Sequence, residues 1–128
     1  TLFRSVFDRK YTWYCFDKLD VTAMKKAAAL LVGEHDFKAF CSNKRTNKST
    51  VREIYDIDIY ADTRELQITV YGNGFLYNMV RIIVGTLIEV GKGERRPEEM
   101  TAILESRDRT KAGATAAAQG LFLQEVEY

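Results

Sequence analysis

The segment that most restricts how this chain can fold is residues 75–90, which read FLYNMVRIIVGTLIEV. Its pattern predicts a helix that is apolar almost all round, and a helix of that kind is normally buried in a core. The exceptions are Asn78, Arg81, Gly85 and Glu89, whose spacings of three and four place them on one stripe of the helix. The fold must therefore bury this helix while accommodating one polar stripe.

Arg81 lies in the middle of this expected helix and has no carboxylate three or four residues away. Because a buried guanidinium without a partner is costly, we expect its counter-ion to come from elsewhere in the fold, another polypeptide or a phosphate. Gly85 costs about 1 kcal/mol of helix propensity relative to alanine, which indicates that another group approaches closely there. The alternative is an arginine that extends from the helix edge into solvent, with Gly85 as a packing contact.

The rest of the chain predicts short strands and further helices. We expect strands over 10–16, 55–60, 66–71 and 121–128, helices over 21–32 and from Pro97 onward, a loop over 37–50 and a turn over 61–64. The residues expected to face inward are Met24, Ala27, Ala28 and Leu31 on the first helix, and Met100, Ile103 and Leu104 on the last. The order β-α-β-β-α-(α)-β predicts an α+β fold, a ferredoxin-like sandwich with an antiparallel sheet and its helices on one face.

Size and charge bound the possible functions. A chain of 128 residues with 46% apolar side chains suits one compact domain, so we expect residues 1–128 to form a single domain. The net charge of +1 gives no global attraction for nucleic acid, so a polyanion would have to bind a local patch. Without a signal peptide or a long uncharged apolar run, we expect a soluble, cytoplasmic protein with no membrane partner. Because the chain begins with Thr1, we also expect it to be excised from something longer.

One local patch is basic. Between Asp36 and Glu53 the chain has no acidic residue, and it carries Lys38, Lys44, Arg45, Lys48 and Arg52. Such a segment is suited to phosphate contacts. The alternative is an ordinary solvated loop.

His35, the only histidine, lies between two acidic residues. We expect no metal site, because no cysteine or histidine stands at ligand spacing and Cys15 and Cys41 lack the CxxC pattern. A hydrogen-bonded structural or substrate-contacting histidine is favoured over a general acid or base. Asp36 could serve as a nucleophile, but nothing near it in the sequence marks it as activated. These residues alone do not identify an enzyme.

Two blocks of the sequence resemble a known family. Residues 33–41 (GEHDFKAFC) and residues 72–85 (GNGFLYNMVRIIVG) are similar to the C-terminal half of the tRNA pseudouridine synthase A family. Residues 112–121 resemble the same family more loosely, and the likeness extends from about Tyr11 to Tyr128. The second block is long and specific.

The resemblance implies an isomerase that converts uridine to pseudouridine in the anticodon stem-loop of tRNA, without metal or cofactor. It implies a homodimer whose sheet is shared by two ferredoxin-like halves. The family's catalytic Asp belongs to an Arg-Thr-Asp motif of the N-terminal half, and this sequence contains no such motif: Arg45-Thr46-Asn47 and Arg109-Thr110-Lys111 lack the carboxylate.

The resemblance also implies roles for residues of this half. Arg81 would form an ion pair with the catalytic Asp of the missing half, and Met79, with Phe75 or Leu76, would form the apolar wall near the base. We assign tRNA contacts to His35, Lys44, Arg45, Lys48 and Arg52.

The sequence departs from the family in its tail. The family often reads Gly-Pro-Thr-Ala-Pro-Ala where residues 113–118 read GATAAA, and losing two prolines should loosen that loop. We expect the isolated chain to be inactive without the N-terminal half. The alternative functions are a non-catalytic RNA-binding domain or a protein-interaction domain of the same architecture. An RNA-recognition motif is disfavoured because residues 66–71, in which Tyr71 is the one aromatic, do not provide the set of stacking aromatics that it needs.

Overall fold

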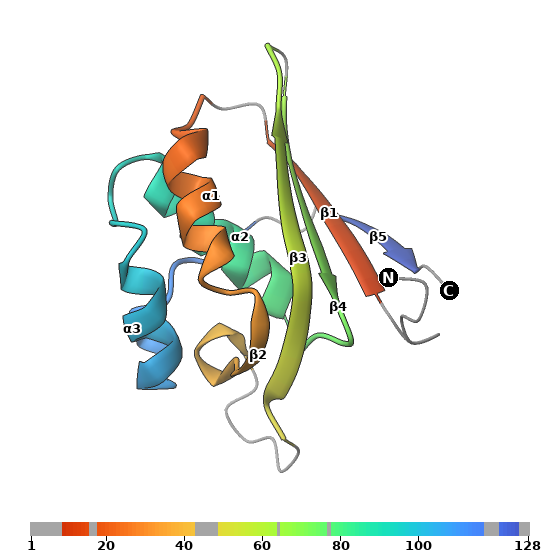
Figure 1. Ribbon diagram of the computed structural model, residues 1–128, viewed down its shortest axis with the longest axis vertical. Coiled ribbons are helices and arrows are strands. Elements are labelled where there is room, and N and C mark those ends of the chain that lie inside the picture. Colours follow the sequence, from red (N-terminus) through yellow and green to blue (C-terminus); the bar gives the residue numbers. More distant parts are fainter. Residues whose placement is uncertain are drawn as a thin grey trace.

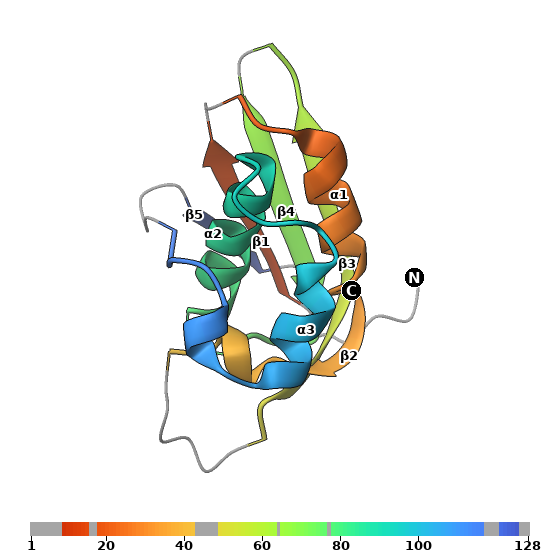
Figure 2. The same ribbon diagram turned by 90° about the vertical axis from the view of Figure 1, so that its left-hand side faces the viewer.

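The computed structural model describes residues 9–15, 18–42, 49–63, 65–76, 78–116 and 121–125. In these parts of the chain, five strands form one sheet, and α1, α2 and α3 lie together on one of its faces (Figures 1 and 2). The elements follow in the order β1 (Arg9–Cys15), α1 (Val21–Ala29), β2 (Gly33–Asp36), the 3₁₀ helix η1 (Lys38–Phe40), β3 (Val51–Ala61), β4 (Leu66–Gly72), α2 (Met79–Gly91), α3 (Glu99–Ser106), the 3₁₀ helix η2 (Arg109–Lys111) and β5 (Leu121–Glu125).

The sheet has the strand order β2-β3-β4-β1-β5, and every neighbouring pair is antiparallel. Consequently β1 and β3 run in the same direction with β4 between them, which is the arrangement of a split βαβ unit. The α+β class, the antiparallel sheet and the one-sided helices predicted from the sequence are confirmed. The prediction omitted β2, which adds an edge strand by pairing Gly33–Asp36 with the first residues of β3.

The core lies between the sheet and the helices. The inward residues predicted for α1 and α3 are all buried, with Met24, Leu31 and Met100 fully inaccessible. Seven apolar residues of α2 are buried as well, which confirms the prediction for this helix: Met79, Val80, Ile82, Ile83, Val84, Leu87 and Val90. Within the described residues, no helix has both the length and the apolarity needed to cross a membrane.

Each of the three α-helices has a boundary that differs from the predicted one. α2 begins at Met79 rather than residue 75, because Asn78 adopts a left-handed conformation (φ 59°) that a continuous helix does not allow. The first helix ends at Ala29 instead of residue 32. α3 begins at Glu99, two residues after Pro97, and Glu99 Oε2 accepts a hydrogen bond from the Arg96 amide at 2.7 Å.

The strand predicted over 55–60 is longer and contains an irregularity. The register of β3 against β4 shifts between Ile54 and Asp56. The buried residues of β3 are therefore Ile54, Ile57 and Ile59, and Tyr55 is only half-buried. The alternation predicted for this strand holds from Ile57 onward.

Candidate functional site

Arg81 lies in the first turn of α2 and is half-buried. Its Nε donates a hydrogen bond of 2.7 Å to the carbonyl of Ala116, and its Nη1 donates one of 3.3 Å to Asn78 Oδ1. The Ala116 amide donates in turn to the carbonyl of Arg81 at 2.9 Å. Both side-chain partners are neutral, and no ion pair of the described residues includes Arg81. The guanidinium is thus fixed in orientation while its charge has no carboxylate partner in this part of the chain.

The polar stripe of α2 is covered by residues 112–116, which we call the docked segment. Figure 2 shows this stretch, just after η2, running beside α2. The Gly113 amide donates to Thr86 Oγ1 at 2.8 Å, and the Ala114 amide donates to Glu89 Oε2 at 3.0 Å. A Cβ added to Gly85 would overlap the carbonyl oxygen of Ala114. The prediction that another group approaches the helix closely at Gly85 is therefore confirmed.

Glu89 lies at the other end of this stripe, toward the C-terminus of α2. Its Oε1 pairs with Arg95 Nε at 2.6 Å, and the two side chains are 23% and 21% exposed. Burial raises the pKa of Glu89, but the hydrogen bonds from Arg95 and the Ala114 amide, with the charges of Arg95 and Lys92, outweigh burial and leave the pKa lowered. The carboxylate is therefore ionised at neutral pH.

Two residues of the basic segment lie beside the stretch of chain that leads into α2. Asn78 Nδ2 donates to Ser42 Oγ at 3.3 Å, and the Arg52 side chain lies 3.8 Å from the position a Cβ would take on Gly74. Arg52 also donates from Nη1 to the carbonyls of Ser49 and Val51 at 2.8 and 2.7 Å. Lys44, Arg45 and Lys48 lie outside the described residues. The fold thus brings Ser42 and Arg52, on either side of residues 43–48, next to Asn78 and Gly74 in the stretch before the helix that carries Arg81.

His35 and Asp36 both have structural contacts. His35 Nε2 lies 3.0 Å from the carbonyl of Val32, and its ring meets Phe37 edge-on with centroids 5.6 Å apart. His35 is opposite Arg52 in the β2–β3 register, and residues directly opposed across an antiparallel pair share one face of the sheet.

The carboxylate of Asp36 connects three parts of the chain. Its Oδ1 accepts from the Lys38 amide at 3.1 Å and from Thr50 Oγ1 at 2.5 Å, and its Oδ2 lies 3.5 Å from Arg107 Nε. These contacts hold η1 beside the start of β3.

The three apolar residues expected near a base differ in accessibility. Phe75 and Leu76 are half-buried and pack against the core. Met79 is fully buried, and its Sδ accepts from the Leu76 amide at 3.5 Å. Phe75 and Leu76 therefore lie nearer the surface than Met79, and the role of all three in a substrate pocket stays a prediction.

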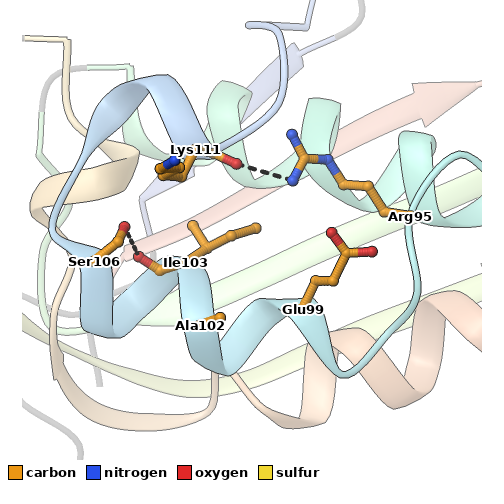
Figure 3. A pocket seen from close by; sticks show the side chains of 6 residues that line it. All are labelled: Arg95, Glu99, Ala102, Ile103, Ser106 and Lys111. Carbon is orange, nitrogen blue, oxygen red and sulfur yellow. Dashed lines mark hydrogen bonds between the residues drawn. The ribbon is translucent and has the colours of Figure 1, made fainter.

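A shallow hollow of about 260 Å³ lies beside α3 (Figure 3). It is lined by Arg95, Glu99, Ala102, Ile103, Ser106 and Lys111. None of the residues predicted for the site lines it, and Arg95 Nη1 is bonded to the Lys111 carbonyl at 2.9 Å. In the described stretches of the chain, no group of three or more His, Cys, Asp or Glu side chains could hold a metal ion.

Three further residues hold the docked segment and were missed from the sequence: Thr86, Arg95 and Arg109. Arg109 donates from Nη1 to the Gly113 carbonyl at 2.9 Å and from Nη2 to Thr115 Oγ1 at 3.2 Å. Thr86 was detectable as a hydroxyl within an apolar helix. No local pattern connects the two arginines with the helix, because their partners are brought together only by the fold.

Comparison with known proteins gives consistent matches. The family model for tRNA pseudouridine synthase matches residues 27–128. A relative called tRNA pseudouridine synthase A in Brevibacillus brevis is 52% identical over 123 residues, which cover 96% of this chain and 50% of the relative. tRNA pseudouridine synthase A 2 of Clostridium tetani is 48% identical, covering 97% and 50% respectively. The chain therefore spans about half the length of the curated relatives that it matches.

Proposed function

Because the chain belongs to the tRNA pseudouridine synthase family, we propose that it is the C-terminal half of an isomerase that converts uridine to pseudouridine in the tRNA anticodon stem-loop. The match to half of each relative's length supports this proposal. So does the absence of an Arg-Thr-Asp motif from the sequence, since the catalytic Asp would then reside in the other half. The non-catalytic alternatives are not favoured by the family match.

The observation that supports the proposal most strongly is that Arg81 is fixed in place without a carboxylate partner among the described residues. Its guanidinium is oriented by Ala116 and Asn78, and no carboxylate of the described residues neutralises it. In the complete enzyme, the catalytic Asp of the N-terminal half would lie beside the Arg81 guanidinium and neutralise its charge. An arginine beside a carboxylate typically lowers its pKa by about 1–3 units, which keeps the Asp ionised and in place.

The chemistry is balanced without a redox partner or cofactor. The bond between ribose C1′ and uracil N1 breaks, C1′ joins C5, and the proton on C5 is released while N1 gains one. A carboxylate can reach the reacting atoms only if the nucleotide leaves its stack, which places the base in an enclosed pocket. We assign Phe75 and Leu76, together with the buried Met79, to the apolar wall of that pocket.

The basic segment supports a tRNA contact beside this pocket. We propose that Lys44, Arg45, Lys48 and Arg52, with His35 on the adjacent strand, contact tRNA phosphates. The support is that Ser42 and Arg52, on either side of residues 43–48, lie beside Asn78 and Gly74, in the stretch of chain that leads into α2.

The wider assembly is also a proposal. The family resemblance implies a cytoplasmic homodimer in which each subunit contains this half and an N-terminal half. Light scattering of the chain mixed with the N-terminal half would measure the assembly directly, and a mass of one copy of each half would contradict the dimer.

The test of the proposed function is Arg81→Ala in the complete enzyme. Removal of one fixed charge-stabilising group typically lowers turnover by about 100- to 1,000-fold, and tRNA affinity should stay close to that of the wild type. Arg96→Ala is the matched control, because it makes the same change at an exposed arginine. Near-normal turnover of the Arg81→Ala enzyme would contradict the assigned role.

A further inference from the structure

The ion pair between Glu89 and Arg95 lies at the far end of α2 from Arg81 but holds the same docked segment. We propose that Glu89 and Arg95 are positioning residues, which fix residues 112–116 on α2 and thereby set the orientation of the Arg81 guanidinium. This inference rests on the proposed function, because it concerns how Arg81 is presented to a carboxylate of the other half.

The two carboxylate oxygens of Glu89 bind different partners. Oε1 binds Arg95 Nε at 2.6 Å, while Oε2 accepts from the Ala114 amide at 3.0 Å. Arg95 in turn uses Nη1 to bind the carbonyl of Lys111 at 2.9 Å, just before the docked segment begins. The pair therefore holds this stretch of chain at two points, Lys111 and Ala114.

The docked segment is held closely along α2 up to Arg81. Gly113 is bonded to Thr86, and the Ala114 carbonyl occupies the space that a side chain at position 85 would need. Two residues later, Ala116 exchanges two hydrogen bonds with Arg81, one through the backbone and one through Nε. A displacement at Ala114 is therefore transmitted over two residues to the group that orients the guanidinium.

The Arg81 side chain needs such a constraint to keep one orientation. An arginine side chain loses rotamer entropy when it is fixed, and within the described residues the guanidinium of Arg81 donates to Ala116 and Asn78. The Ala116 bond is the shorter of the two. Its strength depends on the carbonyl staying in place.

The test compares Glu89→Gln, Arg95→Ala and the double variant in the complete enzyme. A displacement of about 1 Å in a positioned group can lower the reaction rate about 100-fold. We therefore expect kcat to fall at least about tenfold, while KM for tRNA changes less than about twofold. Because both residues act through one segment, kcat of the double variant should be little lower than kcat of the more affected single variant. Glu105→Gln is the matched control, since Glu105 is exposed on α3.

A second readout is the Arg81 Nε–H signal in the NMR spectrum of this chain alone. In both single variants it should shift and exchange faster with solvent, and in Glu105→Gln it should match the wild type. Unchanged kcat and an unchanged signal in Glu89→Gln and Arg95→Ala would overturn the inference. If the wild-type enzyme itself forms no pseudouridine, the proposed function fails instead, while the NMR comparison still decides whether the pair orients Arg81.

Discussion

Gly85→Ala adds a single methyl group at the point where α2 meets the docked segment. The new Cβ would overlap the Ala114 carbonyl oxygen, which belongs to the backbone and cannot rotate away as a side-chain end could. Restoring a non-bonded separation of about 3.5 Å requires residues 112–116 to move off the helix. We expect the substitution to release this segment rather than to unfold α2.

The magnitude follows from the bonds that the segment makes with α2. Four hydrogen bonds join them, through Thr86, Glu89 and the two atoms of Arg81. At about 1 kcal/mol each, their loss outweighs the gain of about 1 kcal/mol in helix propensity from alanine. The free energy of unfolding should therefore fall by about 2–3 kcal/mol, although the same substitution in an open helix would raise it.

The assay is urea unfolding of this chain, combined with hydrogen exchange at the Gly113, Ala114 and Ala116 amides. Gly74→Ala is the matched control, because a Cβ there would meet only ordinary contacts of 3.8 and 3.9 Å. The variant should lose protection at the three amides, and the control should keep it. A Gly85→Ala chain as stable as the wild type, with all three amides protected, would refute the reasoning.

Three further predictions concern charged groups. Because the pKa of Glu89 is lowered from its ordinary value of 4.5, its contribution to stability should be complete above that pH and be lost as the pH falls through the folded-state pKa. Urea unfolding of Glu89→Gln against wild type across pH would show a stability difference that shrinks in acid, and a constant difference would contradict it. Asp36→Asn should lower the unfolding free energy by about 1–2 kcal/mol and leave turnover of the complete enzyme intact; abolished turnover with a folded protein would instead support Asp36 as a nucleophile. Replacing Lys44, Arg45 and Lys48 together by alanine should weaken tRNA binding. The slope of log binding constant against log salt concentration should become shallower by about 1 for each phosphate that is no longer neutralised. An unchanged slope would mean that these three side chains do not contact the tRNA phosphates.

The helix that carries Arg81 shows what sequence reasoning can reach. Its apolar faces, the polar stripe and the close approach at Gly85 all follow from residue types and their spacing. The identity of the approaching group does not, because residues 112–116 form a small-residue loop without periodicity. The role of Glu89 was hidden for the same reason, since Arg95 and the Ala114 amide meet it only in the folded chain.

The missed edge strand and the late start of α2 have different causes. β2 has the sequence Gly-Glu-His-Asp, which carries no apolar alternation, and it is a strand because its backbone pairs with β3. Residues 75–78 do continue the apolar pattern of α2, but the left-handed Asn78 separates them from the helix. That conformation places the side-chain amide of Asn78 between Arg81 and Ser42, a tertiary contact that helical periodicity does not encode.

The most direct test of the account is pseudouridine formation in unmodified tRNA by this chain, alone and with the N-terminal half added. We predict activity only with both halves, and its loss when this chain carries Arg81→Ala. Activity by the chain alone would mean that a carboxylate within these 128 residues performs the chemistry. That result, or full activity of the complemented Arg81→Ala chain, would contradict the division of the site between two halves.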